Sequence, residues 1–192
     1  MKKVVLLCSA MCLSSIASAN DSYFEVDYMM LTQTLDLPGL DSFDANPPGI
    51  SAKFGGNVSN NLAIEGVIGL GITDDTYVSV PGASFSGKLK TLFGANLVGI
   101  LPIAGTSALF GKVGLAMIDS EISASASGVG SASKSYSDTG ISYGFGFKVG
   151  INNNSGVVLE YVNYPDIGVN DFVTGSDKIK TTSINIGYRS SF

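Results

Sequence analysis

Hydrophobic and polar positions alternate along the last residues of the chain. Ile184, Ile186, Tyr188 and Phe192 fall on one face of a two-residue period, and Asn185, Gly187 and Arg189 fall on the other. This strand ends on an aromatic residue at the last position of the sequence, so we expect no later segment to cover it. Its free edge should therefore pair with a segment earlier in the chain. We expect that partner to be the segment starting near Tyr23, which would close the sheet into a barrel.

Eight segments share this alternation, and most are close to the length of about 9 to 11 residues that a membrane-spanning strand needs. They are residues 23–34, 50–58, 62–73, 88–101, 108–118, 140–151, 157–164 and 179–192.

The connections between these segments alternate in length. Short ones at 59–61, 102–107 and 152–156 are rich in Asn, Gly, Ser or Pro, which accept turn geometry. Long ones fill the remaining gaps, at 35–49, 74–87, 119–139 and 165–178. This sorting is typical of an up-and-down membrane barrel, with tight turns at one end and long loops at the other. A soluble sandwich would mix its loop lengths.

The two faces of each segment differ in character. In 62–73, Ile64, Ile68 and Leu70 share the face expected to contact lipid, and Glu65 lies on the other with small residues. In 88–101 the pattern is less regular. The best assignment turns Leu89, Phe93, Leu97 and Leu101 outward, which leaves Leu92, Val98 and Ile100 inward. The many glycines suit a narrow barrel, whose interior has little room for side chains.

The first residues follow the pattern of an export signal. Lys2 and Lys3 precede an apolar run from Val4 to about Leu13, and small residues at Ala17 and Ala19 predict cleavage after Ala19. Residues 20–192 would then form one barrel domain. Cys8 and Cys12 lie inside this signal, and neither follows the small residue that a lipoprotein attachment site would favour.

Charge and composition exclude several classes of function. Eleven basic residues face 16 acidic ones, a net charge of -5, so nucleic acid would be repelled. The chain has no histidine, which excludes a Ser-His-Asp triad and an imidazole metal site. Asp138-Thr139-Gly140 matches the aspartic-protease motif, but it borders a Ser-rich loop and we interpret it as a turn.

Four fragments carry a family resemblance over nearly the whole expected domain. They are Ala52-Lys53-Phe54-Gly55 leading to Asn60-Asn61-Leu62-Ala63-Ile64-Glu65, then Phe110-Gly111-Lys112-Val113-Gly114, Leu159-Glu160-Tyr161 and Ile186-Gly187-Tyr188-Arg189-Ser190-Ser191-Phe192. The chain resembles the small OmpA-like and OmpX-like outer-membrane β-barrel families.

The resemblance implies an all-β fold, an eight-stranded antiparallel up-and-down transmembrane β-barrel in the bacterial outer membrane. Both termini would be periplasmic, the long loops extracellular, and lipid and lipopolysaccharide the surroundings. Ile186, Tyr188 and Phe192 resemble the terminal signal read by the barrel-assembly machinery, although Ser190 departs from that pattern. Barrel enzymes of this kind rely on histidine, so we expect no catalysis and no cofactor.

Eight charged residues share the inward face of the predicted strands. They are Glu25, Asp27, Lys53, Glu65, Lys112, Lys148, Glu160 and Arg189. Charges in a confined lumen are costly unless paired. We interpret them as an ion-pair network that fills the barrel, the alternative being the lining of a narrow polar pore.

The predicted long loops carry most of the acidic residues, with only Lys134 well inside them. The simpler interpretation is that these acidic residues form a hydrated surface. The alternative is that they bind divalent cations together with lipopolysaccharide phosphates. Asp74 and Asp75 are the best, though weak, metal candidates. The loop at 120–137 is almost all Ser, Ala and Gly, which predicts a mobile segment. Apolar residues in the first two long loops, such as Phe43 and Phe85, suggest contact with a host or neighbouring cell.

Three hypotheses remain open. The first is a structural or surface-interaction barrel in the outer membrane, and the second is a narrow pore or a carrier for small or hydrophobic molecules. The third is a secreted lipocalin-like binder, which shares up-and-down closure but would place the apolar residues inside.

Overall fold

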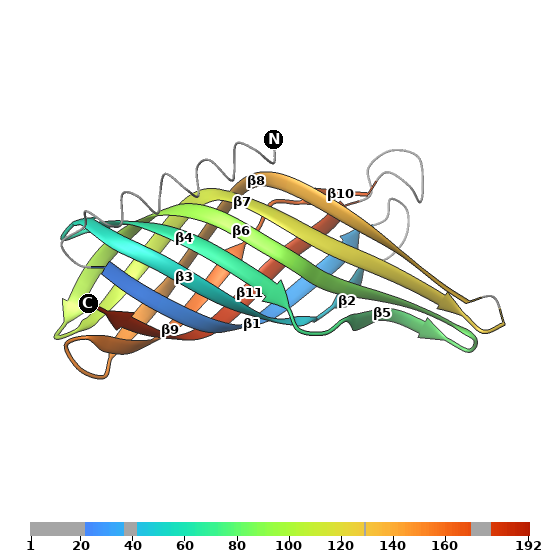
Figure 1. Ribbon diagram of the computed structural model, residues 1–192, viewed down its shortest axis with the longest axis horizontal. Helices are drawn as coiled ribbons and strands as arrows, with labels where there is room; N and C mark the ends of the chain where they lie inside the picture. The colour runs from blue at the N-terminus through green and yellow to red at the C-terminus, as the bar shows by residue number, and fades with distance from the viewer. Residues whose placement is uncertain (1–21, 37–41, 129, 170–177) are drawn as a thin grey trace.

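A computed structural model shows a closed barrel of antiparallel strands (Figure 1). It describes residues 22–36, 42–128, 130–169 and 178–192, so the predicted signal peptide and its cleavage after Ala19 lie outside the described residues. The ring contains, in order, β1 (Ser22–Asp36), β3 (Pro48–Ser59), β4 (Leu62–Gly71), β6 (Ala83–Ala104), β7 (Ser107–Ala126), β8 (Gly130–Gly150), β9 (Ser155–Asn163) and β11 (Lys178–Ser191). This confirms the predicted all-β, eight-stranded barrel.

Three short strands flank the ring. β2 (Phe43–Ala45) pairs with β1, β5 (Asp75–Val80) pairs with β6, and β10 (Ile167–Gly168) pairs with β11. Within the described ranges, no helix is both long enough and apolar enough to cross a membrane.

The first and last strands close the barrel, as the terminal alternation predicts. β1 and β11 pair continuously from Tyr23 opposite Ser191 to Asp36 opposite Lys178. Backbone bonds in both directions join Ser22 to Phe192, with N–O distances of 3.1 and 2.9 Å. Closure therefore removes both sheet edges over the length of the barrel.

The ring strands are unequal in length. β6, β7 and β8 contain 22, 20 and 21 residues, whereas β4 contains 10. The excess residues of the three long strands continue beyond the ring together with β5 (Figure 1). We call this extension, formed by residues 75–90, 119–126 and 130–138, the projecting sheet.

The projecting sheet corrects two predicted loops. Most of 74–87 and 119–139 is strand, and β7 and β8 pair without interruption from Ala108 opposite Lys148 to Ala126 opposite Gly130. Ser and Ala cannot build a core, but their backbone groups complete a hydrogen-bonded ladder as well as those of larger residues do. Composition alone therefore predicted an irregular segment where the strand pairing continues.

Side chains alternate between the outer face and the lumen as predicted for most strands. In β1, Glu25 and Asp27 are buried while Val26 and Tyr28 are exposed. The exposed apolar residues form a band around the barrel, which includes Met30, Ile50, Ile68, Leu70, Leu97, Val113, Leu115, Ile141, Phe145, Ile184 and Ile186. The apolar face is thus on the outside, which argues against the lipocalin-like hypothesis.

One predicted face in β6 is wrong. Leu89 was expected to face outward with Phe93, but it is fully buried, while Leu97 and Leu101 are exposed as predicted. The β6–β7 register shifts between Leu89 and Thr91, where β6 carries an extra residue. Such a bulge reverses the facing of every residue beyond it.

Glycine allows close packing inside the barrel. A Cβ atom added at Gly55 would lie 2.0 Å from the Tyr23 ring, so only glycine leaves room for this tyrosine. Gly66 faces outward, and a Cβ atom there would be 4.0 Å from its nearest neighbour, the Phe54 carbonyl. The interior glycine thus has a packing reason that the outward one lacks.

Candidate functional site

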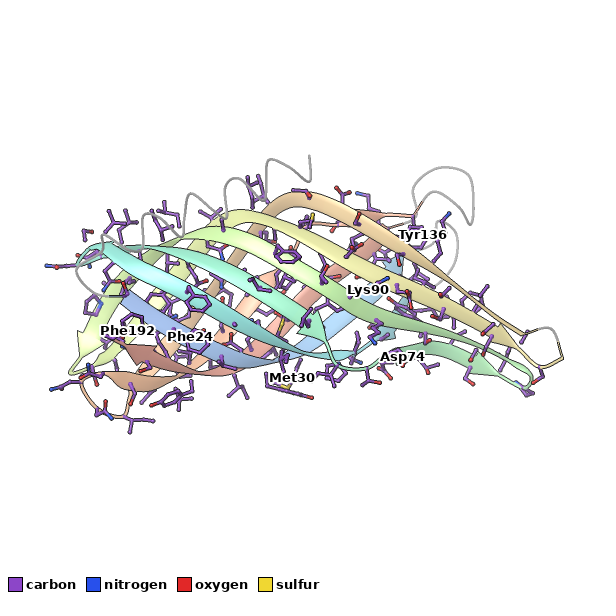
Figure 2. All side chains as sticks on the ribbon, in the orientation of Figure 1. Phe24, Met30, Asp74, Lys90, Tyr136 and Phe192 are labelled. Carbon is purple, nitrogen blue, oxygen red and sulfur yellow. The ribbon has the colours of Figure 1, made fainter. Side chains whose placement is uncertain are left out.

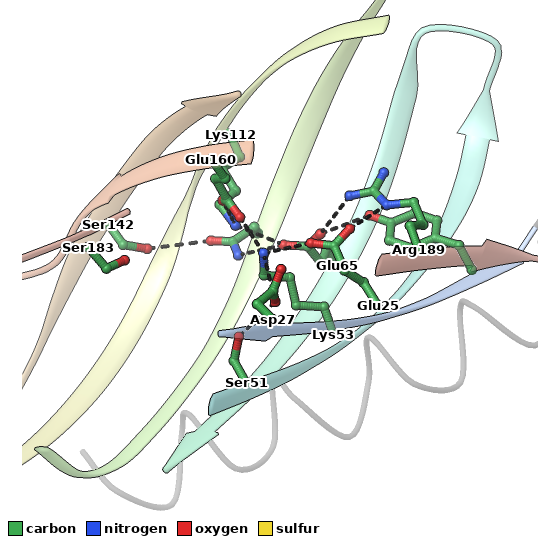
Figure 3. Close-up of polar contacts among 12 residues, drawn as sticks. Glu25, Asp27, Ser51, Lys53, Glu65, Lys112, Ser142, Glu160, Ser183 and Arg189 are labelled. Carbon is green, nitrogen blue, oxygen red and sulfur yellow. Dashed lines mark hydrogen bonds and ion pairs between the residues drawn. The ribbon is translucent and has the colours of Figure 1, made fainter. Parts of the chain in front are cut away.

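Charged side chains form a layer across the middle of the lumen (Figure 3). Lys53 on β3 lies at its centre, with its Nζ 2.8 Å from Glu25 Oε1 and 3.2 Å from Asp27 Oδ2. It also forms an ion pair with Glu160, which reaches across from β9. These four side chains are at most 2% exposed, so water does not screen their interactions.

Strand register brings part of this layer together. Glu25 lies directly opposite Lys53 in the β1–β3 pair and directly opposite Arg189 in the β1–β11 pair. The Arg189 Nε atom is 2.5 Å from Glu25 Oε2, as expected for a charge-assisted hydrogen bond. Arg189 therefore forms an ion pair with Glu25 across the pair of strands that closes the barrel.

A second group of contacts links Glu65 to the rest of the layer. Lys112 Nζ is 3.1 Å from Glu65 Oε1 and also forms an ion pair with Glu160. Arg189 Nη2 is 3.8 Å from Glu65 Oε2. Seven of the eight predicted lumen residues therefore belong to one network, which we call the charged layer: Glu25, Asp27, Lys53, Glu65, Lys112, Glu160 and Arg189.

Lys148 lies apart from this layer. It is on the inner face of β8 and partly buried, but among the residues that the structure describes it makes no ion pair. Lys112 is opposite Gly144 on β8, Phe110 is opposite Gly146, and Ala108 is opposite Lys148. Lys148 therefore lies one inward-facing position beyond Phe110, closer to the short turns than Lys112 is. Alternation predicted its face correctly, but not its distance from the acids.

Neutral side chains complete the charged layer, and sequence reasoning did not assign them to it. Tyr23 Oη donates to Glu65 Oε2 at 2.9 Å, Ser51 Oγ donates to Asp27 Oδ2 at 2.8 Å, and Asn96 Nδ2 donates to Glu65 Oε1 at 3.3 Å. All three lie on inward positions of their strands. The alternation alone could have indicated that they face the lumen.

Apolar layers cover the charged layer on both sides. Along β4 the inward residues run Ala63, Glu65, Val67, and along β9 they run Val158, Glu160, Val162. The first residue of each triplet belongs to an apolar cluster near the short turns, with Tyr23, Val98 and Phe110. The last belongs to a larger cluster on the side of the projecting sheet, which includes Met29, Leu31, Leu89, Leu92, Ile118, Ile167 and Ile179. The lumen is therefore packed in three layers, apolar, charged and apolar.

The projecting sheet has two chemically different faces. Ser84, Ser125 and Ser131 lie side by side across three strands, and one residue further along, Phe85, Ala124 and Ala132 do the same on the opposite face. The hydroxyls of Ser84 and Ser125 are 2.8 Å apart. A shallow groove on the sheet is lined mainly by small residues, namely Ala83, Phe85, Ala124, Ser125, Ala126, Gly130, Ser131 and Ala132.

Lysines balance part of the acidic charge at this end of the barrel. Lys90 pairs with Glu121 at 3.3 Å, Lys178 with Asp166 at 3.6 Å, and Lys180 with Asp36 at 2.5 Å. Hydrogen bonds from Lys180 and Ser42 lower the pKa of Asp36. Three of the described acids in this region, Asp36, Glu121 and Asp166, therefore have lysine partners on a surface that water still reaches.

The two metal candidates lie near the base of the projecting sheet, where Figure 2 labels Asp74. Asp75 Oδ2 accepts a hydrogen bond of 2.6 Å from the Asn46 backbone N–H, and Thr73 Oγ1 is within 3.5 Å of Asp74 Oδ1. Across the described ranges, no group of three or more His, Cys, Asp or Glu residues could hold a metal ion. The metal hypothesis for Asp74 and Asp75 therefore rests on their adjacency in the sequence alone.

Of the predicted assembly residues, Phe192 lies at the end of the barrel opposite the projecting sheet (Figure 2). Ile186 and Tyr188 are about half exposed, and Phe192 is 76% exposed. Ile186 and Tyr188 thus lie on the outer face of β11, and Phe192 directly follows that strand.

Comparisons with known proteins agree with this architecture. The family model for the outer membrane protein beta-barrel domain matches residues 4–192. A search of curated proteins finds no match.

Solved structures with the same fold have different activities. The attachment invasion locus protein Ail of Yersinia pestis is 16% identical, with a TM-score of 0.57 and 91% of this chain and 99% of Ail covered. Neisserial surface protein A is 17% identical, with a TM-score of 0.55 and coverage of 89% and 97%. The outer membrane protease OmpT of Escherichia coli is 9% identical, with a TM-score of 0.52 and coverage of 91% and 98%. At these identities the likeness shows the fold alone.

Proposed function

The chain belongs to the outer membrane protein beta-barrel family, and we propose that within it the protein is a non-catalytic barrel that contacts other surfaces through its projecting sheet. The family implies a location in the bacterial outer membrane. The observation that carries the proposal is the extension of β6, β7 and β8 far beyond the ring (Figure 1). Strand residues beyond those needed to cross the bilayer add nothing to spanning it.

The orientation follows from the same feature. We infer that the short turns and both chain ends face the periplasm and that the projecting sheet is extracellular, because barrels of this kind have short periplasmic turns. Phe192 would then lie at the periplasmic end, where the barrel-assembly machinery could recognise it with Ile186 and Tyr188. Lipid and lipopolysaccharide would surround the exposed apolar band.

The packed lumen supports a role without transport. A polar pore needs a continuous wet path, but apolar side chains of Tyr23, Val98 and Phe110 close one side of the charged layer and Met29 and Leu92 close the other. The narrow-pore alternative is tested by recording from purified protein in planar bilayers. Steady conductance that rises on Glu65→Gln or Lys112→Met would support the pore and overturn the packed lumen.

Charge narrows the choice of partner. A structure of Ail has been determined in complex with the heparin analogue sucrose octasulfate. In this chain the extracellular end carries Asp44, Asp74, Asp75, Asp119 and Asp138, and three of its five lysines, at positions 90, 178 and 180, are paired with acids. We therefore expect highly sulfated polyanions to bind poorly, and we favour a neutral or amphiphilic cell surface as partner.

Shortening the projecting sheet tests the proposal. We would replace residues 79–84 and 124–132 each by Asn-Gly, which joins paired strands in a two-residue turn, and leave the ring intact. Outer-membrane vesicles carrying this variant should lose binding to cultured host cells and to neighbouring bacteria. The matched control replaces Asn60-Asn61 by Asn-Gly at the opposite end, and heat-dependent gel mobility shows that both variants are folded. Undiminished binding by the shortened variant would overturn the proposal.

A further inference from the structure

The outer face of the projecting sheet carries a regular set of hydroxyl groups. They form two rows, and each row crosses the four strands β5, β6, β7 and β8. Neighbouring positions in a row are about 5 Å apart, and the two rows are about 7 Å apart along the strands. We call these eight residues the hydroxyl array: Ser79, Ser84, Ser125 and Ser131 in the row nearer the tip, and Thr76, Ser86, Ser123 and Ser133 in the row nearer the ring.

The hydroxyl array lies on the same side of the wall as the exposed apolar band of the barrel. β7 and β8 pair without a register shift over the whole length of β7, so the alternation of faces is unbroken along both strands. On β7 the outward positions therefore run from Val113 and Leu115, which are about half exposed, to Ser123 and Ser125. The outer wall thus changes from apolar to hydroxyl-bearing without changing face (Figure 1).

Solubility alone does not explain the composition of the hydroxyl array. All eight side chains are exposed or half-buried, yet none is charged, whereas typical soluble surfaces are about 25–35% charged. Charge returns in the next row toward the ring, where Lys88 lies opposite Glu121. The opposite face of the sheet carries Phe85 and Ala124 in place of hydroxyls. An uncharged hydroxyl surface is therefore specific to the outer face of the projecting sheet.

Hydroxyl groups in this arrangement suit a ligand that both donates and accepts hydrogen bonds. The Oγ atoms of Ser84 and Ser125 are 2.8 Å apart, and a hydroxyl has one donor and two acceptor sites, so each keeps capacity for an outside partner. A protein partner would need large apolar or arginine anchors, and a polyanion would need cations, neither of which the array contains. Sugars, which carry many hydroxyls, are the complementary ligand.

The position of the hydroxyl array selects the source of these sugars. In the outer leaflet of an outer membrane, the sugars of lipopolysaccharide stand directly above its acyl chains. A lipopolysaccharide molecule whose acyl chains lie against Val113 and Leu115 would place its sugars beside Ser123 and Ser125, because all four residues belong to one face of β7. A free polysaccharide has no comparable reason to meet this face.

We propose that the hydroxyl array binds the core sugars of lipopolysaccharide in the same membrane. This inference goes beyond the proposed function. It requires the projecting sheet to be extracellular, as inferred above, but does not require the sheet to contact another surface. Bound sugars would cover the outer face of the sheet and leave the opposite face, with Phe85, open to a partner.

Cysteine labelling tests where the sugars lie. The only cysteines of the chain, Cys8 and Cys12, precede the predicted cleavage site, so one reporter can be placed on the outer face at Ser133 or on the opposite face at Ala132. Proteoliposomes contain lipopolysaccharide with a complete core or deep-rough lipopolysaccharide, which lacks most core sugars. With the complete core, a maleimide should label Ser133→Cys about tenfold more slowly than in deep-rough proteoliposomes. Ala132→Cys should be labelled equally fast in both.

Removing hydroxyls separates binding from crowding. A fourfold alanine variant in the Ser133→Cys background should lose the slower labelling, because alanine keeps the backbone pairing but offers no hydrogen bond. The matched control, Ala124→Ser/Ala126→Ser on the opposite face, should keep it. Heat-dependent gel mobility shows that each barrel is folded, and Ser123→Ala/Ser125→Ala alone gives the same comparison if the fourfold variant does not fold. The four serines replaced are Ser84, Ser86, Ser123 and Ser125.

Three outcomes would overturn the inference. The first is equal labelling of Ser133→Cys with both lipopolysaccharides. The second is slower labelling that persists in the alanine variant, which would mean that the sugars only crowd the sheet. The third is slower labelling restored by dextran in deep-rough proteoliposomes, which would make the ligand a free polysaccharide.

Host-cell binding keeps this inference distinct from the proposed function. The fourfold alanine variant should bind host cells as wild type does, because its opposite face is unchanged. The shortened variant decides the proposed function whichever way the labelling turns out. Loss of host-cell binding in the alanine variant would mean that the hydroxyl array meets the partner surface, which would overturn its assignment to core sugars in the same membrane.

Discussion

The charged layer and the projecting sheet follow the same two-residue alternation, yet they differ in almost every other respect. In the charged layer, side chains from β1, β3, β4, β7, β9 and β11 converge, and each contact depends on several strands. In the projecting sheet, only the base contributes to the lumen, where Tyr77, Leu89, Ile122 and Tyr136 join the larger apolar cluster. Toward its tip the side chains are mainly Ser and Ala, and backbone pairing joins the neighbouring strands. Alternation therefore determines which face a residue occupies, while the number of strands around it determines what that face can do.

The two regions should also respond differently to mutation. Lys53 and Glu25 are buried where an unpaired charge is strongly unfavourable, whereas the side chains of Lys90 and Glu121 are 44% and 28% exposed. An ion pair contributes little at the second position, because water and salt screen it. Stability should thus depend on the charged layer and surface contact on the projecting sheet.

Removing Lys53 should have the largest effect. Lys53→Met keeps the side-chain volume but leaves Glu25, Asp27 and Glu160 without their shared cation, so the free energy of unfolding should fall by about 3–5 kcal/mol. Urea titration of the barrel in lipid vesicles measures this change. Because the chain has no tryptophan, unfolding is monitored by gel mobility. A loss below about 1 kcal/mol would mean that water enters the layer and screens it.

A methyl group beside Tyr23 should have a smaller effect. Gly55→Ala places its Cβ on the Tyr23 ring and must displace the hydroxyl that donates to Glu65, which should cost about 1–3 kcal/mol. Gly66→Ala is the matched control, because its Cβ makes only an ordinary contact, 4.0 Å from the Phe54 carbonyl, on the outer face. Equal urea midpoints for the two variants would contradict the packing argument.

The exposed pair in the projecting sheet should matter least for stability. Glu121→Ala removes the 3.3 Å contact with Lys90, and we expect a change within about 0.5 kcal/mol in the same urea titration. A loss comparable to that of Lys53→Met would show that the projecting sheet contributes to the cooperative unit of the barrel.

The smallest effect that we predict concerns the pKa of Asp36. The outward positions of β1 change from Met30 to Thr32, Thr34 and Asp36, so this carboxylate lies beyond the apolar band. Its lowered pKa means that it stabilises the fold above its ordinary pKa, and that this contribution disappears as the pH falls through the lowered value.

Carboxyl NMR titration can follow that contribution. Lys180→Ala should raise the pKa of Asp36 toward its ordinary value, because the hydrogen bond from Lys180 is the main cause of the shift. Lys178→Ala, the matched control, should change it less, since Lys178 acts only through its charge at longer range. Equal shifts from both variants would mean that general charge and not the hydrogen bond lowers the pKa.

Particular residues show how far sequence reasoning reached. Glu25 and Arg189 could be predicted as neighbours, because closure between the first and last strands follows from the alternation at both ends. Lys148 could be assigned to the inner face but not to a level in the barrel, since the level depends on the stagger of β8 against β7. Leu89 was placed on the wrong face, because one extra residue at the bulge has no local signature in the pattern.

The sequence by itself determined the class of fold, the closing pair of strands and the inward set of charges, because a two-residue period is a local property of each strand. The tertiary structure alone decided the length of β6, β7 and β8, the bulge beside Leu89 and the contacts within the charged layer. These depend on register between strands far apart in the chain, and register is set by hydrogen-bonded neighbours. The Ser- and Ala-rich segments therefore form a projecting sheet only because β6, β7 and β8 continue to pair beyond the ring.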